Sequence, residues 1–115
     1  MMDKPTLQID IETFGSSTVL IPLGDIDLSK SSDLRTALRP IIDAIPDKII
    51  VDLAHVPYMD SSGIATLIEG LQLSKNSNIR FMICSLQEGV RSIIELARLD
   101  QIFTIFDSRE DSLAN

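Results

Sequence analysis

Polar and apolar residues alternate near the start of the chain. This period of two covers about residues 7–13 and predicts a strand with one solvated face. A turn at residues 15–17 separates it from a second apolar run over residues 18–23. Because the connection is short, the two strands are expected to form a hairpin. Pro22 removes one backbone donor, so we expect it near a strand end or at a sheet edge.

The next apolar stretch has helical spacing. It predicts a helix that begins after candidate N-cap residues at positions 29–32 and ends before Pro46. Pro40 lies inside this stretch and is expected to kink or divide the helix, because proline lacks an N–H and crowds the preceding turn. Residues 49–53 are nearly all apolar and predict a third strand with both faces covered. The helical apolar positions are Leu34, Ala37, Leu38, Ile41, Ile42 and Ile45.

Helix and strand patterns continue to alternate through the second half of the chain. A helix is expected from about residue 61 to 75, a fourth strand over residues 79–84 and a fifth over residues 102–106. Between those strands, Ser85 and Glu88 have the spacing of a capping box, which predicts the start of a third helix. The buried stripe expected for that helix consists of Val90, Ile93, Ile94 and Ala97.

The resulting order is β-β-α-β-α-β-α-β. Strands that alternate with helices are joined by right-handed crossovers and form parallel pairs, while the opening hairpin adds one antiparallel pair. The sequence therefore predicts a single α/β domain over residues 1–115, with a mixed, mostly parallel sheet and packed helices. We expect an ordered core over about residues 7–107 and a polar C-terminal tail over residues 108–115 that contains one helical turn.

The third strand leads into a polar helix start at residues 60–63. Asp60 is the expected N-cap, because its side chain can accept hydrogen bonds from backbone N–H groups that lack an intrahelical partner. Ser62 points almost opposite the apolar stripe of this helix and Ser61 lies at its margin, so Ser62 is expected to be the exposed hydroxyl. At the positive end of the helix dipole, a phosphate on Ser62 would be tolerated. The apolar stripe consists of Ile64, Leu67, Ile68 and Leu71.

Small and polar residues follow Ser62 along the same helix. Taken alone, the tetrapeptide at residues 60–63 is of a kind that is common in proteins, and it fits an ordinary capped helix start. Gly63, however, is a poor helix former, and its missing side chain is expected to leave the surface beside Ser62 open to a partner. We interpret the exposed face that continues from Ser62 as a docking surface. Its expected members are Ala65, Thr66, Glu69 and Leu73.

The charge of the chain favours protein partners. Its 115 residues carry ten basic and seventeen acidic side chains, a formal net charge of −7, without a Lys/Arg cluster. This balance argues against binding to nucleic acids or to an anionic membrane surface. No apolar run approaches the roughly 18 residues of a membrane-spanning helix, and residues 1–5 have no signal-peptide core. We therefore expect a cytoplasmic protein.

Signatures of enzymes and of metal sites are mostly missing. The sequence has no glycine-rich phosphate loop, no G-x-S-x-G motif and no pair of metal-spaced Cys or His residues. His55, the only histidine, is expected in the loop after the third strand, where a Ser-His-Asp triad is disfavoured because no oxyanion hole is indicated. Cys84 is expected in the core, and Asp25 with Asp27 offers too few ligands for a metal. We expect a protein without enzyme activity, cofactor or metal.

Four segments carry a resemblance to a known family. They are Gly24-Asp25-Ile26-Asp27, Val51-Asp52-Leu53, Tyr58-Met59-Asp60-Ser61-Ser62-Gly63-Ile64 and the run over residues 91–100. In this order and spacing they resemble a STAS domain of the anti-sigma-factor antagonist type, and the resemblance covers about residues 7–112.

The resemblance implies a phosphorylation switch in a signalling pathway that regulates transcription by partner switching. In such antagonists the unphosphorylated protein binds an anti-sigma factor, which is also a serine kinase with a histidine-kinase-like ATPase fold, and this binding frees a sigma factor. The kinase phosphorylates the serine before the glycine, here Ser62, and the complex dissociates. A metal-dependent serine phosphatase restores the binding form. Asp27 is implied to lie close to Ser62 and to help contact the kinase.

A second interpretation stays open. STAS domains also serve as soluble accessory subunits of lipid-transporting ABC systems and as scaffolds in stress-signalling assemblies. They occur as appendages of anion transporters too, which the lack of membrane segments in this sequence disfavours. A serine directly before Gly63 favours the phosphorylated antagonist. The adjacent Ser61 is a second hydroxyl that could also be modified. The predicted partner-binding surface comprises Asp27, Asp60, Ser61, Ser62, Gly63, Ala65, Thr66 and Glu69.

Overall fold

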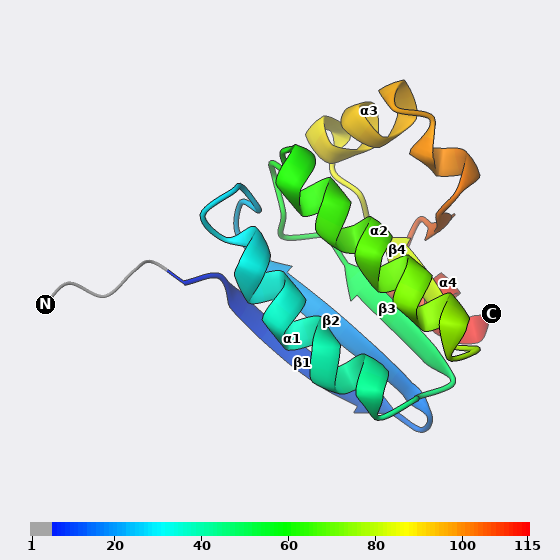
Figure 1. The fold of residues 1–115 in the computed structure, drawn as a ribbon. Coiled ribbons are helices and arrows are strands. Elements are labelled where there is room, and N and C mark those ends of the chain that lie inside the picture. The colour runs from blue at the N-terminus through cyan, green and yellow to red at the C-terminus, as the bar shows by residue number, and fades with distance from the viewer. Residues whose placement is uncertain (1–5) are drawn as a thin grey trace, which may run out of the picture.

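One mixed sheet of five strands runs through the domain, and its spatial order is the chain order, β1-β2-β3-β4-β5 (Figure 1). The computed structural model describes residues 6–115, so the expectation about a signal peptide at residues 1–5 lies outside the described residues. The elements are β1 (Gln8–Phe14), β2 (Ser17–Leu23), α1 (Ser31–Asp43), β3 (Lys48–Asp52), α2 (Ser61–Asn76), β4 (Arg80–Cys84), α3 (Glu88–Leu96), the 3-10 helix η1 (Leu99–Gln101), β5 (Thr104–Phe106) and α4 (Arg109–Ala114). The predicted element order and the α/β fold class are confirmed.

The strand pairing is also the predicted one. β1 and β2 form an antiparallel hairpin, and β2, β3, β4 and β5 pair in parallel. Pro22 lies near the end of β2, beyond the four residues of β2, 17–20, that pair with β3. The missing N–H of Pro22 therefore interrupts no bond to β3.

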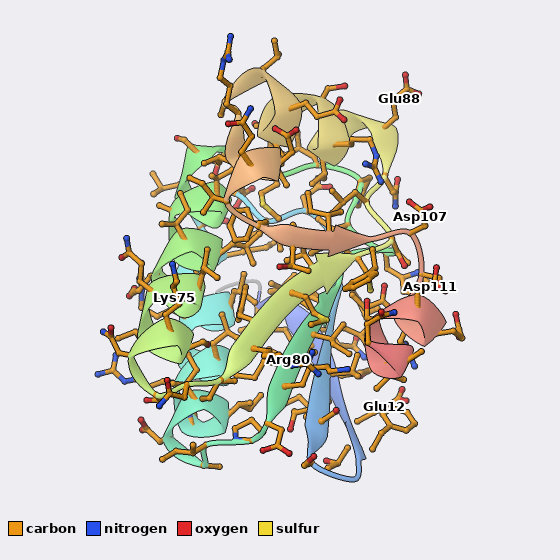
Figure 2. The ribbon with its side chains drawn as sticks, turned by 90° about the vertical axis from the view of Figure 1, so that its right-hand side faces the viewer. Glu12, Lys75, Arg80, Glu88, Asp107 and Asp111 are labelled. Atoms are coloured by element: carbon orange, nitrogen blue, oxygen red, sulfur yellow. The ribbon has the colours of Figure 1, made fainter. Side chains whose placement is uncertain are left out.

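Helices cover both faces of the sheet. α1 and α2 lie side by side over one face (Figure 1), where the larger apolar cluster is buried. α4 lies on the opposite face (Figure 2), where Leu113 packs against a second cluster that includes Ile50 and Met82. All five residues of β3 are consequently buried, as the apolar run over residues 49–53 predicts.

The C-terminal residues dock as a helix, where the sequence predicted a polar tail. Ser108 caps α4 by accepting a hydrogen bond from the backbone of Asp111. The buried ammonium of Lys48 donates to the backbone oxygens of Ser112 and Leu113, at 2.7 and 3.2 Å. On the same side, Nε of Arg109 lies 3.1 Å from the Asp52 carboxylate. A six-residue helix is too short for its buried side to be read from periodicity.

Asp27 fixes the start of α1, whose N-cap lies within the predicted residues 29–32. The N-cap is Lys30, and its side chain makes no capping hydrogen bond. The backbone oxygen of Asp27 instead accepts from the N–H groups of Lys30 and Ser31, at 3.0 and 2.9 Å. The Asp27 carboxylate accepts from the backbone and the hydroxyl of Ser29, at 3.0 and 2.7 Å. The serines thus lie within a turn that Asp27 organises.

α1 is one helix, where a kink or a division was expected at Pro40, and it ends before the last apolar residue of the predicted stretch. The helix is not divided at Pro40, which lies on its exposed side, where water can satisfy the carbonyl that loses its donor. It ends at Asp43, and Ile45 has a left-handed φ of 51° and is exposed. The expectation that Ile45 continues the buried stripe is therefore wrong, because the chain has already turned toward β3.

The predicted capping box at Ser85 is wrong. Ser85 has a left-handed φ of 61°, and its N–H donates to the backbone oxygen of Phe106 in β5. The N-cap of α3 is Gln87, whose side chain makes no capping bond and donates to the backbone oxygen of Ala54 at 2.8 Å. α3 therefore begins at Glu88, and Ala97 at its end is exposed, where a buried residue was expected.

Two loops at one end of the sheet are tied together. Ile26, between β2 and α1, forms a parallel bridge with Met59, between β3 and α2. The N–H of Ile26 donates to the backbone oxygen of Tyr58 at 3.0 Å, and the N–H of Asp60 donates to that of Ile26 at 3.2 Å. The bridge carries the parallel pairing of β2 and β3 past the ends of both strands and brings the start of α2 against the start of α1.

Gly63 is buried against this bridge. A Cβ at Gly63 would lie 2.5 Å from Cγ of Met59, 2.9 Å from Cγ2 of Ile26 and 3.0 Å from the backbone oxygen of Ile26. The expectation that Gly63 opens the surface beside Ser62 is wrong, because its missing side chain makes room for the Ile26 loop inside the protein.

Substituting Gly63→Ala is expected to destabilise the domain. Overpacking typically costs about 1–3 kcal/mol, and the gain in helix propensity of about 1 kcal/mol offsets it only in part. Chemical denaturation should therefore show a lower free energy of unfolding for Gly63→Ala. Gly70→Ala is the matched control, because the closest atoms there are side-chain tips of Phe81 and Leu38 at 3.1 to 3.4 Å, which can shift. An equal or smaller loss at Gly63 than at Gly70 would contradict the prediction.

Candidate functional site

The Asp60 carboxylate holds the start of α2 and reaches the neighbouring loop. Its Oδ1 accepts hydrogen bonds from the backbone N–H of Ser62 at 2.9 Å, from the Ser62 hydroxyl at 2.5 Å and from the N–H of Gly63 at 3.3 Å. Its Oδ2 accepts from the N–H of Leu28 at 3.0 Å. The predicted N-cap is confirmed, and the same carboxylate also links α2 to the loop before α1.

These donors keep Asp60 ionised. The hydrogen bond from the Ser62 hydroxyl, helped by the N–H groups of Gly63, Ser62 and Leu28, lowers the pKa of Asp60 below its ordinary value, against a smaller opposing effect of burial. Hydrogen bonds to the charged form of a carboxylate favour that form. The hydroxyl of Ser62 therefore donates a hydrogen bond to a negatively charged group, and its oxygen lone pairs stay available.

The two serines differ in exposure, and in the opposite sense to the prediction. Ser61 is exposed and Ser62 is half-buried. Thr66, expected on the exposed face, is 1% exposed, and its hydroxyl donates to the backbone oxygen of Ser62 at 3.0 Å. The reason is that the face opposite the apolar stripe packs against α1, a neighbour that the periodicity of α2 does not reveal. Ala65 is exposed, as predicted.

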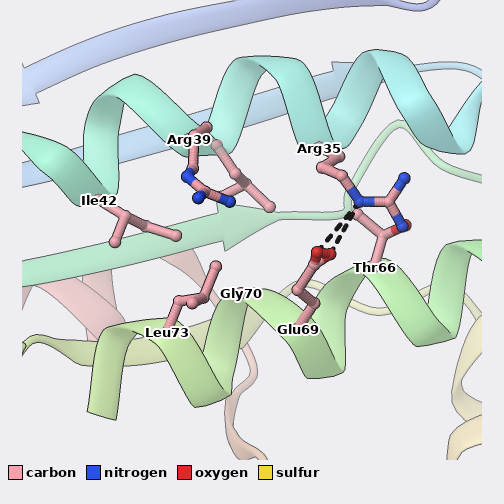
Figure 3. Close-up of a pocket in the computed structure, with 8 residues that line it drawn as sticks. Arg35, Arg39, Ile42, Thr66, Glu69, Gly70 and Leu73 are labelled. Carbon is pink, nitrogen blue, oxygen red and sulfur yellow. Dashed lines mark hydrogen bonds and ion pairs between the residues drawn. The ribbon is translucent and has the colours of Figure 1, made fainter. Parts of the chain in front are cut away.

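A groove between α1 and α2 runs along this face (Figure 3). Thr66, Glu69, Gly70 and Leu73 line it from α2, and Arg35, Leu38, Arg39 and Ile42 line it from α1. Nε of Arg35 donates to both carboxylate oxygens of Glu69, at 2.8 and 3.1 Å. The two side chains are 50% and 36% exposed, and such a solvated pair contributes little to stability. Glu69 and Leu73 are thus partly covered by α1.

Asp27 belongs to the same cluster. It is half-buried and follows Ile26, which is bridged to Met59, and it precedes Leu28, which donates to Asp60. The fold therefore brings the loop that contains Asp27 against the start of α2. The two segments are far apart along the chain: Leu28 and Asp60, which share a hydrogen bond, are separated by 32 residues.

Two large apolar side chains beside this cluster are exposed. Leu28 is 77% exposed and Tyr58 is 49% exposed, and the backbones of both are held next to Asp60 by the hydrogen bonds of the bridged loops. The sequence analysis assigned no role to either side chain. The sequence shows that both are apolar residues in predicted loops, but it does not show that they lie close together, because their proximity depends on the Ile26–Met59 bridge.

The other residues considered as candidates, His55 and Cys84, do not belong to this site. His55 is exposed in the loop after β3, and Cys84 is buried on β4, both as predicted. Burial raises the pKa of the Cys84 thiol above its ordinary value, with the nearby Asp52 acting in the same direction.

Within residues 6–115, no group of three or more His, Cys, Asp or Glu side chains is arranged to hold a metal ion. No helix in that part of the chain is long and apolar enough to cross a membrane.

Comparison with known proteins points to one family. The family model described as "STAS domain" matches residues 8–112. The anti-sigma-F factor antagonist RsfB of Mycobacterium tuberculosis is 24% identical over 113 residues, which cover 98% of this chain and 92% of RsfB.

Solved structures share the fold. The crystal structure of an anti-sigma factor antagonist from Mycobacterium paratuberculosis has a TM-score of 0.87 at 23% identity, covering 94% of this chain and 92% of that chain. The Bacillus cell fate determinant SpoIIAA in its phosphorylated form has a TM-score of 0.72 at 16% identity, covering 93% of this chain and 97% of that chain. The helix start at residues 60–63 lies within the residues that the family model matches, 8–112.

Substituting Ser62→Ala is expected to raise the pKa of Asp60 toward its ordinary value, because the hydroxyl donor is lost. A lowered pKa stabilises the folded state above the pKa of an unfolded aspartate, about 3.9, and this contribution is lost as the pH falls through the folded-state value. The stability difference between wild type and Ser62→Ala should therefore shrink in acid. Carboxyl NMR titration measures the pKa, and Ser61→Ala is the control, since Ser61 is not a donor to Asp60. An unchanged Asp60 pKa in Ser62→Ala would refute the assignment.

Proposed function

Because the chain belongs to the STAS domain family, we propose that it is a cytoplasmic anti-sigma-factor antagonist whose partner binding is switched off by phosphorylation of Ser62. In its unphosphorylated form it binds an anti-sigma serine kinase of the ATPase fold and thereby releases a sigma factor. A serine phosphatase removes the phosphate and restores binding. The chain itself acts by binding and catalyses no step.

The observation that carries the proposal is the position of the Ser62 hydroxyl. It is half-buried at the first turn of α2 and donates to an ionised carboxylate. In the phosphoryl transfer, the Ser62 oxygen forms a bond to the γ-phosphorus of ATP while the bond from that phosphorus to ADP breaks, and the hydroxyl proton passes to a base of the kinase. The relatives named as antagonists and the phosphorylated SpoIIAA neighbour support this assignment.

Electrostatics explains why a phosphate would end binding while the fold persists. Phosphorylation adds about 1.5 to 2 negative charges and replaces the hydroxyl donor to Asp60 by a group that repels its carboxylate. In the free protein, water and the N-terminal end of α2 stabilise this charge. Under a bound partner the water is excluded, and like charges placed together cost several kcal/mol. About 1.4 kcal/mol already corresponds to a tenfold loss of affinity.

Exposed residues around Ser62 form the proposed contact surface. Ser61, Ala65 and Leu28 are exposed, and Tyr58 is about half exposed. Asp27 and Glu69 add partly exposed carboxylates. The buried Gly63 and Thr66 would act indirectly, by holding the start of α2 in place.

A direct test incubates the protein with ATP and a candidate ATPase-fold kinase from the same cell, followed by intact-mass measurement and peptide mapping. One added phosphate on Ser62, with loss of the complex, is expected. We further expect Ser62→Ala to bind the kinase without being modified and Ser62→Asp to bind poorly, whereas Ser61→Ala should still be phosphorylated. Equal binding of the kinase by Ser62→Ala and Ser62→Asp would contradict the electrostatic switch. Capture of an ABC ATPase with no modification would favour an accessory subunit.

Leu28 is expected to contribute strongly to the affinity for the kinase. Its side chain is 77% exposed, and burying a leucine side chain contributes about 1.5–3 kcal/mol relative to leaving it exposed. Leu28→Ala keeps the backbone N–H that donates to Asp60, so we expect a loss of at least about tenfold in affinity with an unchanged fold. Calorimetric titration measures this, with Ile45→Ala as the matched control, because Ile45 is 61% exposed beyond the far end of α1. Similar losses for both variants would contradict the proposed surface.

A further inference from the structure

Arg35 uses only part of its guanidinium. Its ion pair with Glu69 is made by Nε alone, at 2.8 and 3.1 Å. Within residues 6–115 its two terminal amino groups have no hydrogen bond, and Figure 3 shows them extending away from Glu69, on the side of Thr66. A guanidinium carries five donors in a planar fork that matches phosphate. The two terminal amino groups of Arg35 are therefore available to bind an anion.

The free amino groups point along α2 toward the end that carries Ser62. Ser62, Thr66 and Glu69 are spaced by four and three residues, so they share one helix face. Thr66 lies between the other two, and its hydroxyl is bonded to the backbone of Ser62. Seven residues separate Glu69 from Ser62, a helix rise of about 10.5 Å. The terminal amino groups of Arg35 lie on the Thr66 side of Glu69, so a change of rotamer of this exposed side chain brings them toward a phosphate ester on Ser62.

The immediate surroundings of Ser62 are otherwise anionic. Asp60 accepts its hydrogen bond and is held ionised, and the loop that contains Asp27 lies alongside. On α1 the cations nearest to this end are Lys30 at the N-cap and Arg35 in the second turn, while Arg39 lies one turn further away. Beside water and the N-terminal end of α2, Arg35 on the groove between the two helices can supply a positive counter-charge to a phosphate placed here.

We propose that Arg35 is the receiving site for a phosphate carried on Ser62, binding the phosphomonoester through its terminal amino groups while Nε keeps or exchanges its bond to Glu69. This inference rests on the proposed phosphorylation of Ser62. The contact would hold the phosphate against the groove between α1 and α2. The phosphorylated form would thereby be stabilised within its own fold.

The test places phosphoserine at position 62 during protein synthesis, so that no kinase is needed, and follows the phosphate by ³¹P NMR titration. The second pKa of phosphoserine is ordinarily about 6, and a guanidinium in contact with the phosphate lowers it by favouring the dianion. We expect Arg35→Ala to raise this pKa by at least about half a unit. Glu69→Gln should lower it, because the carboxylate that competes for Arg35 loses its charge.

Arg39→Ala is the matched control, since it removes the same charge from the same groove one turn further from Ser62. It should shift the phosphate pKa by less than half as much as Arg35→Ala. Equal shifts in both variants, no shift in Arg35→Ala, or a larger shift in Lys30→Ala would each overturn the assignment to Arg35. Amide NMR spectra of the unphosphorylated variants verify that they fold.

The result separates this inference from the proposed function. Because the phosphoserine is installed without a kinase, a protein that no kinase modifies in the cell would defeat the proposed switch while the titration still reports on Arg35. Conversely, kinase modification of Ser62 together with an unchanged titration in Arg35→Ala would defeat the role of Arg35 alone.

Discussion

The Asp60 carboxylate is the interaction on which the candidate site depends. One of its oxygens caps α2 and the other accepts from the backbone of Leu28, 32 residues earlier in the chain. Backbone N–H groups at a helix start lack intrahelical acceptors, and an ionised carboxylate binds such donors more strongly than a neutral group does. A single side chain therefore sets the position of the Ser62 hydroxyl relative to the loop that contains Asp27 and Leu28.

The sheet determines where this interaction can form. The loops that follow β2 and β3 leave the carboxyl ends of adjacent parallel strands, and the Ile26–Met59 bridge extends that pairing by one step. In open α/β sheets, binding sites gather at this edge for the same geometric reason. The contacts that close the opposite face, from Lys48 and Asp52 to α4, involve none of the residues around Ser62. Changes at the site can therefore occur without loosening the second layer of the core.

The sequence predicted the parts of this arrangement that depend on local chemistry. The strand and helix order follows from periodicity, and the Asp60 cap follows from residue type at a helix start. The burial of Thr66 could not be predicted in that way, because the face opposite an apolar stripe is solvated only when no second helix packs beside it. The role of Gly63 likewise depends on a loop 37 positions earlier, at Ile26. Periodicity within one helix contains no information about either neighbour.

The same reasoning explains how one added charge can be tolerated by the fold and rejected by a partner. In the free domain Ser62 is half-buried at the positive end of α2, so water and the helix dipole can stabilise an anion there. In the proposed switch, a partner that covers Leu28 and Tyr58 would remove the water and leave a phosphate on Ser62 facing the Asp60 carboxylate in a medium of lower dielectric constant. Because the repulsion grows only when the surface is covered, it acts against the complex far more than against the folded state.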